Sequence, residues 1–264
     1  MAQTFNAIPD KPGFGNGYTL VDEVYVNVNA NTSKIFEEKY IEIRAKENRI
    51  YSDMELRNLP FVENTHLHRK EWQMRSQSAN RLFQYLQQKN MSLKILEVGC
   101  GNGWLSNFLS KNDKNYVVGI DINFTELKQA ARVFKKGNLV FVFDELSEEL
   151  LAEFNFDVVI FAASAQYFYS IKQTIEKILP LINKDGEVHL LDTNFYKPEN
   201  LEAARRGTEE YYSKLGFPEF SKYYHHHSIY DLTALKKDQL YDQTAIKNIF
   251  IRPKNPFPWF RIKR

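Results

Sequence analysis

The chain has 264 residues, of which 43% are hydrophobic and 26% charged, as is ordinary for a soluble globular protein with a sizeable core. Its formal net charge of +2 gives no reason to expect a nucleic acid or an anionic membrane as a partner. One cysteine excludes an intrachain disulfide, and the first residues lack the basic start and apolar run of a signal peptide. No stretch reaches the roughly 18 apolar residues of a membrane span. We therefore expect a cytoplasmic protein.

Residues 1–90 are predicted to form an N-terminal helical extension, because their apolar positions are too sparse for an independent domain. Val24, Val26 and Val28 alternate with Tyr25 and Asn27, which predicts a short half-buried strand. The glycine-rich run 13–17 resembles a phosphate loop, but no apolar strand precedes it and no helix follows it directly, so a surface loop is favoured. Helices are predicted over about 32–48 and 69–90, and we interpret them as lid-like helices packed on the core.

Residues 94–109 predict a buried strand, a tight turn and a helix. Residues 95–98 are mostly apolar, and an amphipathic helical pattern begins at Trp104. Three glycines lie within five residues between them, at Gly99, Gly101 and Gly103. Because glycine permits positive φ and a close approach of the backbone to a ligand, and because a helix N-terminus offers unpaired N–H groups, we expect a small molecule to bind here.

Strands and helices alternate with short connections through residue 195, which is typical of a parallel sheet covered on both faces. Further strands are predicted over 116–121, 139–143, 156–161 and 187–192, and helices over 124–136, with Gly137 as its C-cap, and 171–182. Ligands of such sheets bind beyond the carboxyl ends of the strands.

The last third of the chain has a different character. A polar helix is predicted over 198–215, ending at Gly216, and strands are predicted over 223–230 and 244–251. Two antiparallel strands here would complete a seven-stranded, mostly parallel, doubly wound α/β sheet. The predicted domain organisation is therefore an extension with lid-like helices (1–90) and a ligand-binding domain (91–264), which has a core over 94–195 and C-terminal strands within 196–264.

The glycine turn does not fit the dinucleotide fingerprint Gly-x-Gly-x-x-Gly, whose third glycine allows a helix to pack closely on the strand. Counted from Gly99, that position holds Trp104, and counted from Gly101 it holds Ser106. The pattern that is present, Glu97-x-Gly99-x-Gly101-x-Gly103, resembles motif I of the class I S-adenosylmethionine-dependent methyltransferases.

The resemblance continues in the family's order over about residues 94–195. Asp121 ends the second strand, where the family places the acid that binds both ribose hydroxyls. Asp144 follows the third strand, where the family often contacts the adenine amine, and Glu145 is an alternative for that contact. Asp185 replaces the first glycine of the family's Pro-Gly-Gly turn. The implied set of cofactor contacts is Glu97, Gly99, Cys100, Gly101, Asp121, Ile122, Asp144, Glu145 and Ala162.

The resemblance implies methyl transfer from S-adenosylmethionine, with S-adenosylhomocysteine as product, to a small or mid-sized acceptor by direct in-line displacement. This chemistry needs positioning and exclusion of water rather than a metal or a covalent nucleophile, and the sequence shows no metal-ligand constellation. Tyr167 and His226 are candidates for an acceptor contact or a general base, with core packing and a surface position as the alternatives. An NAD-type oxidoreductase and a non-catalytic cofactor-binding subunit remain the alternative functions, and the oligomeric state is open.

Overall fold

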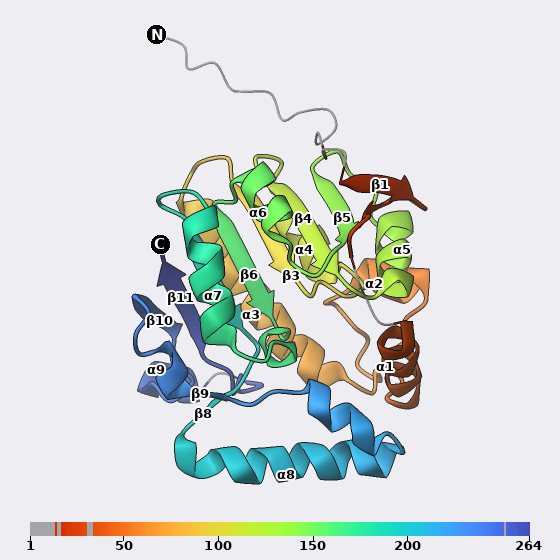
Figure 1. Ribbon diagram of the computed structural model, residues 1–264. Helices are drawn as coiled ribbons and strands as arrows, with labels where there is room; N and C mark the ends of the chain where they lie inside the picture. Colours follow the sequence, from red (N-terminus) through yellow and green to blue (C-terminus); the bar gives the residue numbers. More distant parts are fainter. Residues whose placement is uncertain (1–13, 15–16, 31–33, 251) are drawn as a thin grey trace.

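The computed structural model describes residues 14, 17–30, 34–250 and 252–264, with a central sheet between two layers of helices (Figure 1). Five parallel strands form the middle of this sheet, as the alternation of strands and helices predicted. They are β3 (Lys94–Val98), β4 (Tyr116–Asp121), β5 (Leu139–Phe143), β6 (Val158–Ala162) and β7 (Glu187–Leu191).

The strand order β5-β4-β3-β6-β7 places β3 at the centre of the sheet. The chain runs outward through β4 and β5 on one side and then through β6 and β7 on the other. The switch of direction lies beside β3, and parallel sheets bind their ligands at such a point, beyond the carboxyl ends of the strands. The glycine turn follows β3 and therefore lies at this position.

Helices bury both faces of the sheet, because the central strands are apolar on both sides. One face packs against α3, α4 and α5, and the other against α6 and α7. Their bounds are α3 (Arg69–Gln88), α4 (Trp104–Leu109), α5 (Phe124–Val133), α6 (Glu148–Phe154) and α7 (Ile171–Ile178). The predicted C-cap at Gly137 is wrong, since α5 ends at Val133 with Phe134 as its cap. Nowhere in the described ranges is a helix long and apolar enough to cross a membrane.

The sheet has nine strands rather than the predicted seven. At one edge, β11 (Trp259–Lys263) pairs antiparallel with β7, and β10 (Lys237–Tyr241) pairs antiparallel with β11. The predicted antiparallel pairing is confirmed, but both predicted positions are wrong. Residues 223–230 contain only the two-residue β9 (His227–Ser228), which pairs with β8 (Phe195–Tyr196), and residues 244–250 contain the short helix α9 (Ile246–Ile249).

A hairpin of β1 (Tyr18–Val21) and β2 (Val24–Asn27) supplies the other two strands, and β2 pairs in parallel with β5. This confirms the strand predicted from the alternation around Val24, whose side chain is fully buried. Most of the glycine-rich run 13–17 lies outside the described residues.

A cap of helices lies beyond the carboxyl ends of the parallel strands (Figure 1). It consists of α1 (Lys34–Lys46) and α8 (Pro198–Leu215), which ends at Gly216 with φ 85° as predicted, whereas the short α2 (Asp53–Asn58) packs against α5. Ile43 of α1 and Tyr212 of α8 share a small apolar cluster with Phe217 and Phe220. Because this cluster joins the N-terminal extension to the C-terminal third, both segments reach the ligand end of the sheet.

Candidate active site

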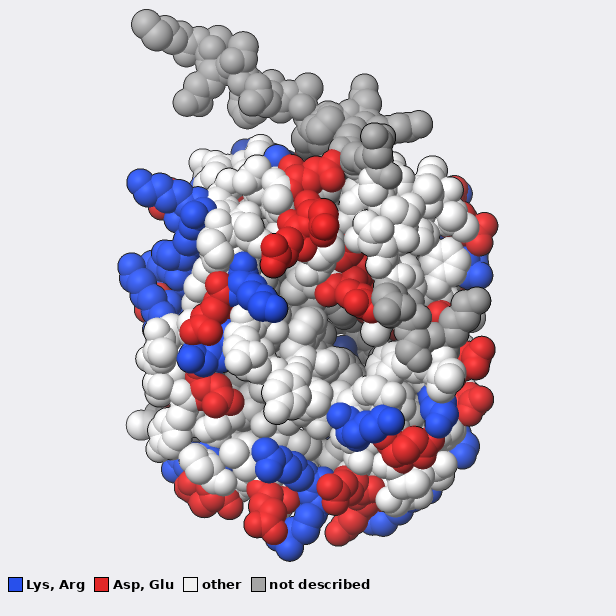
Figure 2. Space-filling model, in the orientation of Figure 1, with Lys and Arg blue, Asp and Glu red and all other residues white. Residues whose placement is uncertain are grey.

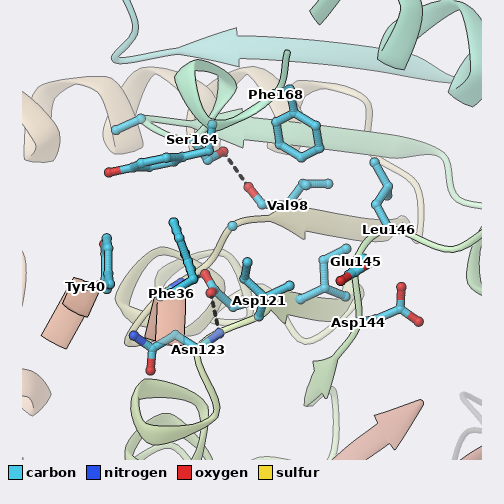
Figure 3. A pocket seen from close by; sticks show the side chains of 16 residues that line it. Phe36, Tyr40, Val98, Asp121, Asn123, Asp144, Glu145, Leu146, Ser164 and Phe168 are labelled. Atoms are coloured by element: carbon cyan, nitrogen blue, oxygen red, sulfur yellow. Dashed lines mark hydrogen bonds between the residues drawn. The ribbon is translucent and has the colours of Figure 1, made fainter. Parts of the chain in front are cut away.

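A pocket of about 270 Å³ lies at the switch point of the sheet, slightly smaller than the roughly 300–1,000 Å³ typical of ligand sites (Figure 3). The face of the molecule is hollowed near its centre, with acidic side chains on the side of the hollow nearest the strands (Figure 2). Seven of the predicted site residues line the pocket: Gly99, Gly101, Asp121, Ile122, Asp144, Glu145 and Tyr167.

The glycine turn brings bare backbone to the floor of the pocket. The N–H groups of Gly99 and Cys100 both donate to the Ile120 carbonyl at 2.9 Å, which ties the turn to β4. Gly99 has φ 70°, and a Cβ atom there would lie only 2.6 Å from Cβ of Ser164 on the opposite wall. A side chain at position 99 would therefore close the space between the ends of β3 and β6.

Asp121 is positioned by the backbone on both sides of it. Its Oδ2 accepts the N–H of Gly101 at 2.7 Å, and its Oδ1 accepts the N–H of Asn123 at 2.8 Å. Burial raises the pKa of Asp121, while these backbone donors oppose the rise. A carboxylate has about four acceptor sites, so each oxygen retains a lone pair for a ligand hydroxyl. The side chain points into the pocket (Figure 3).

Asp144 lines the pocket, but its carboxylate is engaged elsewhere. Oδ2 accepts hydrogen bonds from Tyr18 and Asn27 at 2.7 Å each and from the Ser147 hydroxyl at 2.8 Å, while Oδ1 accepts the Ser147 N–H at 2.6 Å. The oxygens point away from Asp121 (Figure 3). In this structure Asp144 anchors the N-terminal hairpin, whereas its neighbour Glu145 is exposed at the pocket.

An apolar part of the pocket lies near Glu145. It is formed by Ile122 after β4, Leu146 after β5, and Phe168 after β6. Leu146 and Phe168 lie around the same space as Val98 (Figure 3), so a flat apolar ring can be enclosed there.

Glu97 and Cys100 lie behind the turn and do not line the pocket. Glu97 is 3% exposed and accepts a hydrogen bond from the Ser106 hydroxyl at 2.5 Å. Burial raises its pKa to about 8, although the Ser106 bonds oppose this, and the nearby charge of Asp121 adds to the rise. The Cys100 thiol is buried, and burial raises its pKa well above the ordinary value, which makes it an unreactive residue of the turn.

The raised pKa of Glu97 predicts a pH-dependent stability. A carboxyl whose folded-state pKa exceeds its unfolded value stabilises the fold fully below the unfolded pKa of 4.5, and this contribution is lost as the pH rises through about 8. Between pH 6 and pH 9 we expect wild type to lose about 2–3 kcal/mol more unfolding free energy than Glu97→Gln does. Urea unfolding at the two pH values measures this, and an equal loss in both proteins would refute the assignment.

The wall after β6 lies one residue later than predicted. Ala163, with φ 56°, and Ser164 line the pocket in place of Ala162. Ser164 donates to the Val98 carbonyl at 2.5 Å and so joins the ends of β3 and β6. Tyr167 follows in a short 3-10 helix (Ala165–Tyr167) and lines the pocket as predicted.

Sequence reasoning missed two residues of α1 as site residues. Phe36 and Tyr40 close the pocket opposite the strand ends, and the ring centroid of Tyr40 lies 6.3 Å from that of Tyr167 (Figure 3). Both lie in the helix predicted over about 32–48, but no local signal indicated which part of the core that helix covers.

His226 lies outside this pocket. Its Nε2 is 3.0 Å from the Thr208 hydroxyl of α8, and its ring packs against Tyr196 and Tyr224. Burial lowers its pKa, with the nearby charge of Arg205 adding to the effect. Tyr224 and Tyr167 stand between His226 and the pocket, with ring centroids 6.1 Å apart. In this structure, therefore, the His226 side chain does not contact the pocket at the glycine turn. No group of three or more potential metal-ligating side chains occurs in the part of the chain that the structure describes.

Trp104 occupies the position that a dinucleotide fingerprint reserves for glycine. Its ring is 6% exposed and packs edge-on against Trp72 of α3, with centroids 5.4 Å apart. Trp104 therefore contacts α3, and α4 approaches β4 through Ser106, whose Oγ lies 2.7 Å from the position that a Cβ atom would take at Gly119.

Comparison with known proteins finds similarity to methyltransferases. Malonyl-[acyl-carrier protein] O-methyltransferases are 28% identical over 100 residues in Priestia megaterium and 31% identical over 98 residues in Bacillus anthracis. These alignments cover 38% and 37% of this chain, and the chain spans 36% of the length of each relative.

Two solved structures share the fold. The plantazolicin methyltransferase BpumL in complex with a triazolic desmethylPZN analog and SAH has a TM-score of 0.51 at 15% identity, covering 88% of this chain and 98% of its own. Magnesium protoporphyrin IX methyltransferase from Synechocystis with bound SAH has a TM-score of 0.51 at 15% identity, covering 86% and 99%. The family model of the methyltransferase domain matches residues 89–250, well over half of the chain. The chain therefore belongs to the methyltransferase domain family, and its recognition as a class I methyltransferase is confirmed.

Proposed function

We propose that this protein is an enzyme that transfers the methyl group of S-adenosylmethionine to a small or mid-sized acceptor. The observation that carries the proposal is the wall formed by Gly99, Gly101 and Asp121, in which a bare glycine turn is tied to a carboxylate that retains free acceptor sites. Membership in the methyltransferase domain family supports methyl transfer as the reaction. The bare backbone of the turn and the Asp121 carboxylate suit the methionine part and the ribose of S-adenosylmethionine.

The residues of the pocket suit the parts of this cofactor. Asp121 accepts the ribose hydroxyls, and Glu145 and the apolar side chains near it hold the adenine. The turn at Gly99 and Gly101 faces the methionine part, with the buried Glu97 behind it. S-adenosylmethionine supplies a methyl group on sulfonium sulfur, whose S–C bond breaks as the acceptor's lone pair forms the new bond. The protein positions the acceptor near Ala163 and excludes water.

An oxygen or carbon acceptor is favoured over nitrogen. Residues 162–165 read Ala-Ala-Ser-Ala, whereas N-methylating members of the family often carry Asn/Asp-Pro-Pro-Tyr after this strand. The names of the similar proteins from Priestia and Bacillus point to the free carboxylate of a protein-linked malonyl thioester as a second candidate acceptor.

Thermal unfolding with added ligands tests the cofactor assignment. S-adenosylhomocysteine at 100 times its dissociation constant adds about 2.7 kcal/mol of stability, which corresponds to a rise in melting temperature of roughly 5–10 °C for a chain of this size. NAD and NADH at the same concentration should produce no rise. A rise with NAD alone would favour the oxidoreductase alternative instead.

Transfer of labelled methyl from S-adenosylmethionine tests the enzyme assignment. We expect label in a malonyl thioester or in the small-molecule fraction of a cell extract. Binding of S-adenosylhomocysteine without label in any fraction would favour the non-catalytic subunit.

A further inference from the structure

A second cavity, of about 610 Å³, borders the candidate active site. It is lined by residues from the start of α7, from α8 and from the 3-10 helix Pro218–Tyr223. Tyr167 lines the first pocket and Tyr224 lines the second cavity, and their ring centroids lie 6.1 Å apart. Phe168 and Tyr169, which are adjacent in the chain, likewise line one space each. A single layer of aromatic residues therefore separates the two spaces.

Cationic side chains reach the second cavity from all three of these elements. Lys172 comes from α7, Arg205 from α8 and Lys222 from the 3-10 helix. Lys172 faces Glu176 of its own helix at 3.4 Å, whereas Arg205 and Lys222 form no ion pair with any residue that the structure describes. The charges of Arg205 and Lys222 can therefore pair with a ligand that enters the cavity.

Uncharged donors line the same cavity. His225 is half-buried and packs edge-on against Tyr169 with centroids 5.5 Å apart, and its ring nitrogens have no hydrogen-bond partner among the described residues. Ser170 is the N-cap of α7, and its hydroxyl accepts the N–H of Gln173 at 3.3 Å. The remaining N–H groups of this first turn lie at the cavity, where the positive end of the helix dipole favours an anion.

Two carboxylates also line the second cavity. Asp231 is engaged, because its Oδ2 accepts the N–H of Ser228 at 2.8 Å in the cap of a short 3-10 helix. Glu209 is exposed and lies one turn after Arg205 on α8, and its carboxylate forms no hydrogen bond or ion pair with the described part of the chain. The charge of Glu209 opposes an anion, so its removal should strengthen the binding of an anionic ligand.

We propose that the second cavity binds the phosphate group of a phosphate monoester. Such a group carries a charge of about −1.5 to −2 at pH 7 and three strong acceptor oxygens, which suit three cations and the neighbouring donors better than a singly charged carboxylate does. A volume of about 610 Å³ also leaves room for the organic part of the ligand.

The phosphate has two sources. One is the methyl acceptor itself, which would extend from the first pocket past Tyr167 into the second cavity, and this source rests on the proposed function. The other is a separate ligand that occupies the second cavity alone.

Nuclear magnetic resonance titration, observed on the phenyl protons of phenyl phosphate and of benzoate, tests the phosphate site. We expect wild type to bind phenyl phosphate with a dissociation constant on the order of 1 mM and benzoate roughly 5-fold more weakly. Arg205→Gln should weaken the binding of phenyl phosphate by about 3- to 10-fold, because a charged donor is lost. Glu209→Gln should strengthen it by about 2- to 5-fold, because a like charge is removed.

Two neighbouring residues of α8 provide matched controls. Arg206 and Glu210 lie outside the second cavity and pair with residues of their own helix, at 3.9 Å and 4.0 Å. Arg206→Gln and Glu210→Gln change the net charge as Arg205→Gln and Glu209→Gln do, but should leave the affinity unchanged at physiological ionic strength. Equal affinity of all five proteins, or no binding by wild type, would overturn the phosphate site. Benzoate binding as tight as that of phenyl phosphate would overturn the choice of phosphate.

Methyl transfer into a cell extract separates the two sources of the phosphate. The small-molecule fraction is labelled with methyl from S-adenosylmethionine before and after treatment with an immobilised phosphatase, which is then removed. If the acceptor carries the phosphate, the treatment abolishes the label, and Arg205→Gln incorporates label more slowly than Arg206→Gln does. If a separate ligand carries it, the labelled product persists after the treatment. Binding of phenyl phosphate in the expected pattern without any binding of S-adenosylhomocysteine would overturn the proposed function alone.

Discussion

Replacing Asp121 with alanine should weaken binding of S-adenosylhomocysteine by on the order of 100- to 1,000-fold. The variant lacks the carboxylate that we propose accepts hydrogen bonds from two ribose hydroxyls, and each such bond contributes about 1.5–3 kcal/mol when the acceptor is charged. The variant would also lose the contacts with the N–H groups of Gly101 and Asn123, which hold the turn in place. Isothermal titration calorimetry measures the change directly.

Two further variants serve as a conservative substitution and as a control for Asp121→Ala. Asp121→Asn retains acceptor oxygen but not charge, and we expect it to lose part of the affinity only. Asp113→Ala removes an exposed acid from the loop before β4 and should leave the affinity unchanged. Affinity of Asp121→Ala equal to that of wild type would refute the ribose assignment while leaving the proposed reaction intact.

Replacing Gly103 with alanine should destabilise the fold by about 2–5 kcal/mol. Gly103 has φ 72°, a conformation that costs a residue with a side chain about 1–2 kcal/mol. An added Cβ would lie 2.5 Å from Cε1 of Phe141 and 2.9 Å from Cβ of Ala130, so the packing of β5 and α5 would have to shift, at a further cost of about 1–3 kcal/mol. Urea unfolding measures the loss.

Gly137→Ala is the control for this substitution, because nothing lies within 4 Å of an added Cβ and the backbone needs no positive φ. It should change the stability by less than about 1 kcal/mol. Equal stability of the two alanine variants would show that close packing at Gly103 does not contribute to the fold.

Part of the site was predictable because it depends on short stretches of sequence. A strand followed by closely spaced glycines and an acid at the end of the next strand are local patterns, and parallel strands bring such ends to one edge. Gly99, Gly101 and Asp121 therefore lie together in the pocket as expected. Asp144 was also placed correctly along the chain, but two of its hydrogen bonds come from Tyr18 and Asn27, more than 100 residues earlier.

The C-terminal strands show why the edge of the sheet was misplaced. The strand β10 reads Lys-Asp-Gln-Leu-Tyr and lies at the edge of the sheet, where Asp238 and Gln239 are exposed and Tyr241 alone is buried, so no apolar alternation marks it. Conversely, Tyr224 and His226 look like a strand in sequence, but Tyr224 packs against the apolar cluster that contains Tyr212 of α8, and His226 contacts Thr208 of α8 and Tyr196 of β8. Whether a segment pairs with β7 depends on contacts with distant parts of the chain, and these contacts cannot be inferred from the residues of the segment itself.

By itself the sequence determined the class of the sheet, the glycine turn and the acid at the end of the next strand, because each follows from hydrophobic periodicity or from the backbone freedom of glycine over a few residues. Only the tertiary structure decided which side chains close the pocket. Phe36 and Tyr40 line it because α1 packs against α8 through a small apolar cluster that joins segments about 170 residues apart along the chain. Contacts at such separation leave no local pattern, since any helix with a similar apolar face satisfies the same periodicity.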